Sequence, residues 1–144
     1  MSQASVRVRA PTVQSMVLIP APRELQVLDL SSNSISTGGA INIAVALLQS
    51  HSQVQQVLLH DNCISGSTEN LGRALAQLPS IRCIDLSHNS GLSVADCCSV
   101  FASMISNKAP IETLLLPANL FSEFPALFCR HRTPLAGLHT TPCW

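Results

Sequence analysis

Four segments of the chain repeat one order of apolar and polar positions. Each has an apolar residue at its first, fourth and sixth positions and an asparagine at its ninth. The segments begin at Leu25, Val54, Ile81 and Ile111. Their asparagines, at intervals of 29, 27 and 30 residues, are Asn33, Asn62, Asn89 and Asn119. A near-constant period of this length is typical of repeat architectures, in which each repeat is one structural unit packed on its neighbours.

The fourth and sixth positions of each segment are two residues apart, so they share one face of an extended strand. We expect these residues to point inward in pairs: Leu28 and Leu30, Val57 and Leu59, Ile84 and Leu86, Leu114 and Leu116. The asparagine follows where the chain leaves the strand, and its amide can both donate and accept hydrogen bonds. Stacked repeats are therefore predicted to form a structural asparagine ladder.

Between these strands the apolar residues recur every three or four positions, which predicts helices. The helices are predicted over Gly39–Ser50, Thr68–Leu78 and Ser93–Asn107. Ser93 and Asp96 have the spacing of a capping pair, which places the start of the third helix. The residues expected to face inward are Ala40, Ile43, Ala44, Leu47 and Leu48, then Leu71, Ala74, Leu75 and Leu78, then Cys97, Val100, Phe101, Met104 and Ile105.

A strand, a turn, a helix and the next strand within about 28 residues imply parallel strands joined by crossover helices. We therefore predict a short α/β solenoid of about four repeats, with a parallel sheet on its concave side and helices on its convex side. The predicted organisation is an irregular N-terminal segment or cap over 1–24, repeats over 25–53, 54–80, 81–110 and 111–128, and an irregular, loosely ordered tail over 129–144.

The stretch LQVLDLSSNSISTGGAINIAVAL, which begins at Leu25, fits the pattern LxxLxLxxNxLxxxGaxxLaxaL nearly position for position. From residue 25 to about 121 the chain resembles leucine-rich-repeat proteins of the ribonuclease-inhibitor-like class. That class includes ribonuclease inhibitors, cytosolic innate-immune sensors, actin-capping proteins and activators of a nuclear-transport GTPase. The resemblance implies a non-catalytic module that binds a protein on its concave sheet. The alternatives are a GTPase-regulating protein and a truncated fragment of a larger leucine-rich-repeat sensor.

Three stretches depart from the repeat. The third repeat has one extra residue after its asparagine, and we expect Gly91 to absorb it. The fourth repeat changes after Phe121, where residues 124–128 allow one apolar helical turn. Residues 13–18 mimic a repeat strand but begin only 12 residues before Leu25, too close for a crossover helix. They are either an edge strand or cap, or the stump of a truncated repeat.

The other strand positions are expected to point outward and to form a grid that binds a protein partner. Its twelve residues are Val27, Asp29, Ser31, Gln56, Leu58, His60, Cys83, Asp85, Ser87, Thr113, Leu115 and Pro117. The grid has two acids, two leucines and no Lys or Arg, so we expect a basic or amphipathic partner segment. The alternative is that these positions are solvated surface and that loops or the convex helices bind the partner.

The fourth strand, over residues 111–116, is predicted to leave an exposed apolar edge. We expect the C-terminal segment, a partner or residues outside this chain to cover that edge. Association through the C-terminal edge is therefore a further expectation.

Composition narrows the class of partner. Eight Lys and Arg balance eight Asp and Glu, which argues against binding to nucleic acid or to a membrane surface through basic charge. Hydrophobic residues make up 47% and charged residues 11%, the opposite of a disordered chain. No apolar run is long enough to span a bilayer, and no secretory signal is evident. We expect the six cysteines to be thiols in a reducing compartment, the cytoplasm or the nucleus.

Other groups of reactive residues are weak candidates for chemistry. His60, Asp61 and His88 fall near neighbouring strand ends, but the spacing fixes no further ligand beside them, so we expect surface polar residues rather than a metal site. Cys83 has no base at a fixed position and is expected to be an inert thiol. Gly38–Gly39 is interpreted as a turn rather than a phosphate-binding loop. We therefore expect a protein that is not an enzyme and has no cofactor or metal.

Overall fold

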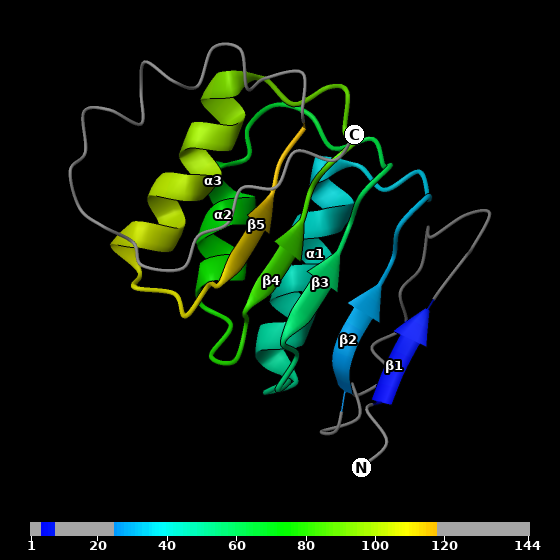
Figure 1. The fold of residues 1–144 in the computed structure, drawn as a ribbon, viewed down its shortest axis with the longest axis vertical. Helices are drawn as coiled ribbons and strands as arrows, with labels where there is room; N and C mark the ends of the chain where they lie inside the picture. Colours follow the sequence, from blue (N-terminus) through cyan, green and yellow to red (C-terminus); the bar gives the residue numbers. More distant parts are fainter. Residues whose placement is uncertain (1–3, 8–24, 118–144) are drawn as a thin grey trace.

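The computed structural model describes residues 4–7 and 25–117 (Figure 1). Its elements are β1 (Ala4–Arg7), β2 (Leu25–Asp29), α1 (Thr37–Gln49), β3 (Gln56–Leu58), α2 (Glu69–Ala76), β4 (Cys83–Asp85), α3 (Val94–Ser106) and β5 (Thr113–Leu115). The described strands form one parallel sheet whose spatial order is the chain order. The chain is therefore mixed α/β, as predicted. No helix in the described part is long and apolar enough to cross a membrane.

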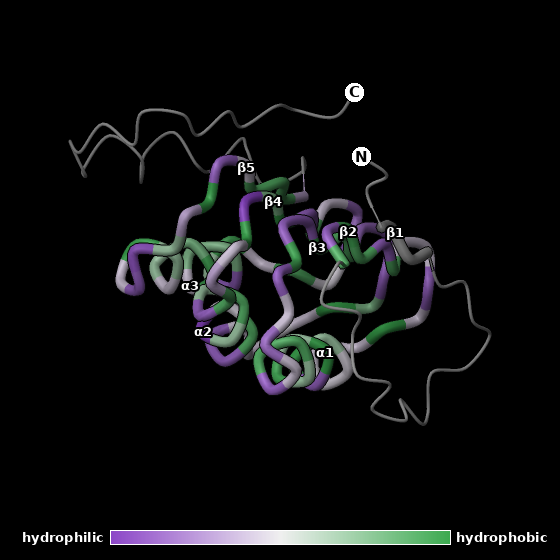
Figure 2. The backbone as a smooth tube through the Cα atoms, turned by 90° about the horizontal axis from the view of Figure 1, so that it is seen from below, coloured by the Kyte–Doolittle hydropathy of each residue, from purple (hydrophilic) through white to green (hydrophobic). Residues whose placement is uncertain are grey.

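The sheet and the helices form two layers, with α1, α2 and α3 on the same side of the sheet (Figure 2). This arrangement follows from the parallel pairing, because each connection has to return across a face of the sheet. The core lies between the layers. Eight residues, two in or directly after each of β2 to β5, were predicted to point inward. All eight are at most 9% exposed, which confirms the predicted inner face.

The buried amide of Asn62 joins two neighbouring segments. Its Oδ1 accepts a hydrogen bond from the backbone N–H of Ile35 at 3.0 Å. Its Nδ2 donates to the carbonyl of Leu30, one strand back, at 3.1 Å, and to the carbonyl of Leu59 in its own segment at 3.0 Å. One side chain thus satisfies backbone groups that both turns leave unpaired.

Asn89 makes the same set of bonds one segment later. It accepts from the N–H of Ile64 at 3.1 Å and donates to the carbonyl of Leu59 at 3.0 Å. It also donates to the carbonyl of Leu86 in its own segment at 2.9 Å. The predicted ladder is confirmed for Asn62 and Asn89, while Asn119 lies outside the described residues.

Helix α1 begins two residues earlier than predicted. The Ser36 hydroxyl accepts a hydrogen bond from the N–H of Gly39 at 3.3 Å, and this cap makes Thr37 the first helical residue. Gly38–Gly39 therefore lies inside the first helical turn. Its interpretation as a turn ahead of the helix is wrong, because the cap side chain reaches past both glycines.

Helix α3 begins with the predicted capping pair. The Ser93 hydroxyl accepts from the N–H of Asp96 at 3.2 Å, and the Asp96 carboxylate accepts from the N–H of Ser93 at 3.0 Å. The Ser93 side chain is the main cause that holds the pKa of Asp96 below its ordinary value. Two donors at the start of the helix are thereby satisfied reciprocally.

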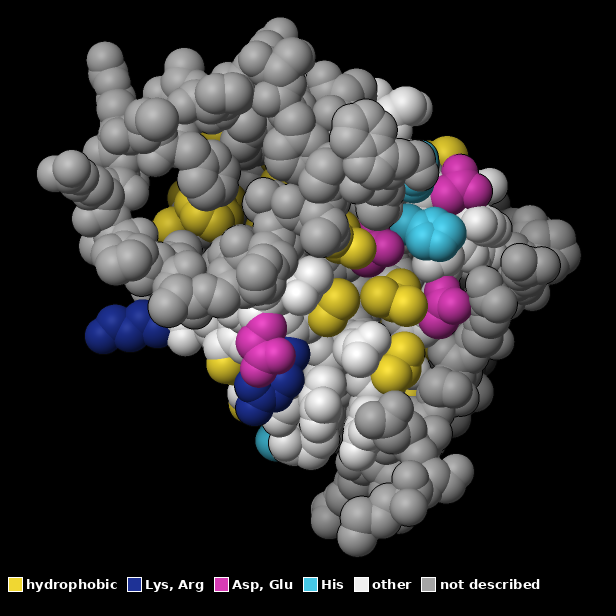
Figure 3. All heavy atoms as spheres, in the orientation of Figure 1, with side chains coloured by type: hydrophobic (Ala, Val, Ile, Leu, Met, Phe, Trp, Pro, Cys, Tyr) yellow, Lys and Arg dark blue, Asp and Glu magenta, His cyan; other side chains and the backbone are white. Residues whose placement is uncertain are grey.

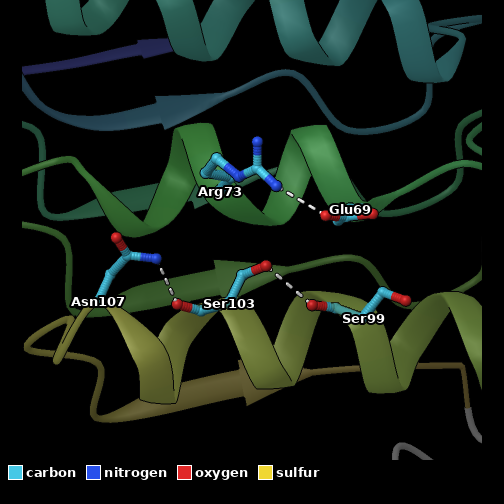
Figure 4. Close-up of polar contacts among 5 residues, drawn as sticks. All are labelled: Glu69, Arg73, Ser99, Ser103 and Asn107. Carbon is cyan, nitrogen blue, oxygen red and sulfur yellow. Dashed lines mark hydrogen bonds and ion pairs between the residues drawn. The ribbon is translucent and has the colours of Figure 1, made fainter.

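Helices α2 and α3 approach closely through small residues. A Cβ at Gly72 would lie 2.8 Å from the Cα of Val100 and 3.1 Å from the Cβ of Ser103. The Ser103 hydroxyl donates to the carbonyl of Ser99 at 2.9 Å within α3 (Figure 4). Because this bond satisfies the hydroxyl locally, the side chain stays compact on its own helix. Gly72 is therefore required by the distance between the helices, not by a special backbone angle.

Ile105 corrects the predicted inner face of α3. The other four predicted residues are buried or half-buried, but Ile105 is 48% exposed. In a helix of 3.6 residues per turn, Ile105 lies roughly 160° around the axis from Ser103, which faces α2. Ile105 is exposed because it lies on the side of α3 that is turned away from α2.

The N-terminal segment contains a strand that the sequence did not predict. β1 pairs in parallel with β2, with Ser5 opposite Val27 and Arg7 opposite Asp29. Residues 13–18, the stretch proposed as an edge strand, cap or stump, lie outside the described residues. The end of the fourth repeat and the 129–144 tail also lie outside them.

Gly91 allows two neighbouring turns to touch. It forms a parallel bridge with Ser65, and a Cβ at Gly91 would lie 2.5 Å from the Cβ of Ser65. The position next to the extra residue of the third repeat thus accepts only a glycine, because a side chain would displace the facing turn.

Candidate functional site

The sheet register brings the predicted binding residues into rows that cross the strands. The first row is Val27, Gln56, Cys83 and Thr113, and the second is Asp29, Leu58, Asp85 and Leu115. We call these eight residues the sheet-face patch. All eight are half-buried, and they alternate with the buried core residues, so they lie on the face turned away from the helices. Hydrophobic and acidic side chains lie side by side on this face (Figure 3).

The third row of the predicted grid is mostly closed. His60 is half-buried, but Ser31 and Ser87 are 4% and 5% exposed and Pro117 is also buried. The expectation that all twelve positions are open is therefore wrong for these three. The regular strands end before this row, at Asp29 for β2 and at the equivalent residues of the others, so the alternation of side chains no longer holds there. Leu58 and Leu115 are also less exposed than expected.

The two acids of the patch also stabilise the turns that follow their strands. The Asp85 carboxylate accepts hydrogen bonds from the N–H of Ser87 at 2.9 Å and from its hydroxyl at 2.6 Å. The Asp29 carboxylate accepts from the N–H of Ser31 at 3.1 Å. These are local side-chain-to-backbone bonds of the kind that aspartate makes in turns. A substitution of either acid therefore changes the fold as well as the surface charge.

Strand β1 extends the second row by one position. Arg7 is the register partner of Asp29, so β1 adds a position beside the row Asp29, Leu58, Asp85, Leu115. The twelve predicted residues contain no basic residue, and the sequence reasoning missed Arg7. The signal was the alternation of apolar and basic residues from Val6 onward, which fits a strand.

The structure brings His60 and His88 together at the carboxyl ends of β3 and β4. Their ring centroids are 6.4 Å apart and their planes meet at 74°, an edge-to-face contact. The Nδ1 of His60 is buried and has no hydrogen-bond partner. In the chain from 25 to 117 and in residues 4–7, no group of three or more His, Cys, Asp or Glu could hold a metal ion. The geometry shows a ring contact between strand ends.

The patch also contains a free thiol in an environment that disfavours its ionisation. Burial, and secondly the charge of Asp85, raises the pKa of Cys83 above its ordinary value. Burial, followed by the charges of Asp96 and Cys98, raises the pKa of Cys97 to about 12. Since the thiolate is the nucleophilic form, both side chains are poor nucleophiles near neutral pH.

We expect iodoacetamide at about pH 8 to label the exposed Cys63 well before Cys97 in the native protein, because Cys97 is both buried and protonated. Peptide mapping by mass spectrometry measures the two rates, and unfolding in concentrated guanidinium chloride should equalise them. The raised pKa also makes stability depend on pH. The unfolded thiol loses its proton at a lower pH than the native thiol. Cys97 therefore does not lower the free energy of unfolding below about pH 9, and it lowers that free energy progressively between about pH 9 and pH 12. Equal labelling of both thiols in the native state would contradict the burial.

Comparison with known proteins identifies no relative of this chain. No protein-family model matches the chain, and no curated protein or solved structure matches it. The fold and the surface define a mixed α/β protein with helices on one face of a parallel sheet and the half-buried sheet-face patch on the other.

Proposed function

We propose that this chain is a non-catalytic protein-interaction module, built as a short leucine-rich-repeat solenoid, which binds its partner on the sheet-face patch. The observation that carries the proposal is the register, which aligns equivalent positions of consecutive segments in two straight rows. The bonds of Asn62 and Asn89 support the repeat interpretation, because each joins a turn to the preceding segment in the same way. The resemblance of the chain to the ribonuclease-inhibitor-like class agrees with both.

The second row suggests the chemistry of the partner. Neighbouring strands lie about 4.8 Å apart, so Asp29 and Asp85, two strands apart, are separated by roughly 10 Å, as are Leu58 and Leu115. A helix advances about 10 Å in seven residues. A partner helix laid across the strands can therefore place two basic residues seven apart against the acids. It can place two apolar residues, also seven apart and offset by about half that interval, against the leucines. A basic amphipathic helix is the segment that fits.

The outer faces of α2 and α3 are weaker candidates for the docking surface than the sheet-face patch. On α2, Arg73 and Glu69 form an ion pair at 2.7 Å within their own helix (Figure 4). On α3, the amide of Asn107 donates to the carbonyl of Ser103 at 2.8 Å. These polar groups already have local partners, which favours the sheet face over the helix face as the docking surface.

A display library of basic amphipathic helices, selected against the full chain, tests the proposal. We expect Leu58→Ser and Gln56→Lys each to weaken binding of the selected peptides about tenfold, by removing apolar contact and by repelling a basic partner. Fluorescence polarisation measures the dissociation constants. Val45→Ser is the matched control, because Val45 is a 37% exposed apolar residue on α1. Peptides that bind Leu58→Ser and Gln56→Lys as well as the original chain would refute the proposal.

A further inference from the structure

Two histidines lie at the carboxyl end of the sheet-face patch. His60 follows Leu58 by two residues, and its ring meets the ring of His88 edge to face at 6.4 Å. His60 is half-buried and His88 is exposed. Figure 3 shows histidine side chains beside acidic and hydrophobic ones on one face of the molecule. We call these two residues the histidine pair, and it borders the surface on which the partner is proposed to bind.

The backbone holds His60 between the two strands that carry the acids of the patch. The N–H of Ser32 donates to the carbonyl of His60 at 3.0 Å, which continues the ladder beyond β2 and β3. Asp29 and Asp85 are the register partners of Leu58 on its two sides. Two residues along a strand and one strand across place the backbone of His60 roughly 8 Å from that of each acid. A positive charge at His60 therefore acts on both acids.

The other charged and titratable groups around His60 keep their charge between pH 7.5 and pH 5.5. In the described residues they are Asp29 with its register partner Arg7 on the β2 side, Asp85, Cys83 and His88 on the β4 side, and Asp61 in the same segment. Aspartate ordinarily titrates near pH 4, whereas histidine gains its charge between about pH 8 and pH 5. The raised pKa of Cys83 keeps its thiol protonated. The histidine pair is therefore the part of this surface whose charge changes in that range.

The surroundings of the His60 ring suit both of its protonation states. Its Nδ1 is buried and has no hydrogen-bond partner, so no bond at this nitrogen fixes one state. The hydroxyl of Ser31, in the neighbouring segment, is also buried without a partner, whereas the equivalent hydroxyl of Ser87 donates to Asp85 at 2.6 Å. A hydroxyl can donate to a neutral ring nitrogen and accept from a protonated one. His60 can therefore gain a proton at Nδ1 without breaking a bond of the fold.

We propose that protonation of the histidine pair weakens partner binding on the sheet-face patch, so that the patch binds its basic partner near neutral pH and releases it in mildly acidic solution. The inference rests on the proposed function, because the added charge opposes only a basic segment. Protonated His60 lies roughly 8 Å from each acid, within the screening length of about 10 Å at 0.1 M salt. It therefore reduces the attraction that the acids exert on basic residues of the partner.

Peptide binding measured at two pH values tests the inference. The probe is a selected helical peptide, acetylated at its N-terminus, whose only charged side chains are Lys and Arg, so that the peptide itself does not titrate in this range. We expect its dissociation constant for the full chain, measured by fluorescence polarisation in about 50 mM salt, to rise at least about fivefold from pH 7.5 to pH 5.5. In about 0.5 M salt the rise should be less than about twofold, because salt screens the repulsion.

Substitutions identify the histidines that cause the change. The double variant His60→Gln, His88→Gln should reduce the ratio of the two dissociation constants to less than about twofold. His51→Gln is the matched control, because His51 is an exposed histidine that directly follows the C-cap of α1, and the full ratio should remain. A double variant that keeps the fivefold ratio overturns the inference.

Two further outcomes separate the inference from the proposed function. Equal binding of the peptide to the original chain at both pH values overturns the inference alone. Selection of no binding peptide at pH 7.5 refutes the proposed function and the inference with it. Circular dichroism at pH 5.5 should match that at pH 7.5, and loss of the native spectrum at pH 5.5 also overturns the inference, because unfolding would then cause the weaker binding.

Discussion

Replacing Asn89 with alanine is expected to lower the free energy of unfolding by about 3–5 kcal/mol. The side chain is fully buried, and its amide serves the N–H of Ile64 and the carbonyls of Leu59, Leu86 and Ser87. Alanine leaves these backbone groups in the interior without partners, and each unmade bond costs about 1 kcal/mol or more. Denaturant unfolding followed by circular dichroism measures the change.

Two further variants at this turn distinguish the loss of stability caused by the missing hydrogen bonds from the effect of any substitution at this turn. Asn89→Asp keeps an acceptor for Ile64 but faces three carbonyls with a carboxylate, so we expect a loss at least as large as for alanine. Ser90→Ala changes the exposed neighbour and should shift stability by less than about 0.5 kcal/mol. A loss below about 1 kcal/mol for Asn89→Ala would show that the ladder does not hold the segments together.

Gly72→Val is expected to destabilise the protein by about 2–3 kcal/mol. The nearest atom to an added Cβ is the Cα of Val100 at 2.8 Å, which belongs to the backbone and cannot rotate away. Helices α2 and α3 therefore have to separate, and the apolar contacts between them weaken. Thermal and denaturant unfolding of the purified variant measure the effect.

Gly38→Ala is the matched control for that substitution. Gly38 also lies in a helix, but a Cβ there comes no nearer than 4.0 Å to another atom, the Ser36 Oγ. We expect alanine at Gly38 to stabilise by about 0.5–1 kcal/mol, because it reduces the freedom of the unfolded chain. If Gly72→Val were as harmless as Gly38→Ala, the close packing of α2 on α3 would be wrong.

The predictable part of the fold follows from local periodicity. Leu28 and Leu30 alternate along a strand, and Ser93 and Asp96 stand three residues apart at a helix start, so both features can be recognised in a short window. The interpretation of Gly38–Gly39 as a turn was wrong because the start of a helix depends on which side chain caps the first free N–H groups, and the Ser36 hydroxyl accepts from the N–H of Gly39.

The candidate site was less predictable. The rows of the sheet-face patch follow from the repeat spacing, and the register aligns them as expected. The closure of Ser31 and Ser87 was not foreseen, because it depends on where each strand ends and on the bonds to Asp29 and Asp85. The position of Arg7 beside Asp29 was missed, because it arises from pairing between residues 22 positions apart outside the repeat period.

The sequence by itself determined which alternate residues of the strands face the core, that a helix follows each of three strands, and that Asn62 and Asn89 bond the turns. These properties depend on spacing along the chain, and the spacing is fixed by the geometry of single strands and helices. Only the tertiary structure decided that Ile105 is exposed, that Gly72 admits no side chain, and that Arg7 is the register partner of Asp29. The reason is that each of these depends on which element lies alongside, and neighbours in space are set by the packing of the whole sheet and its helices.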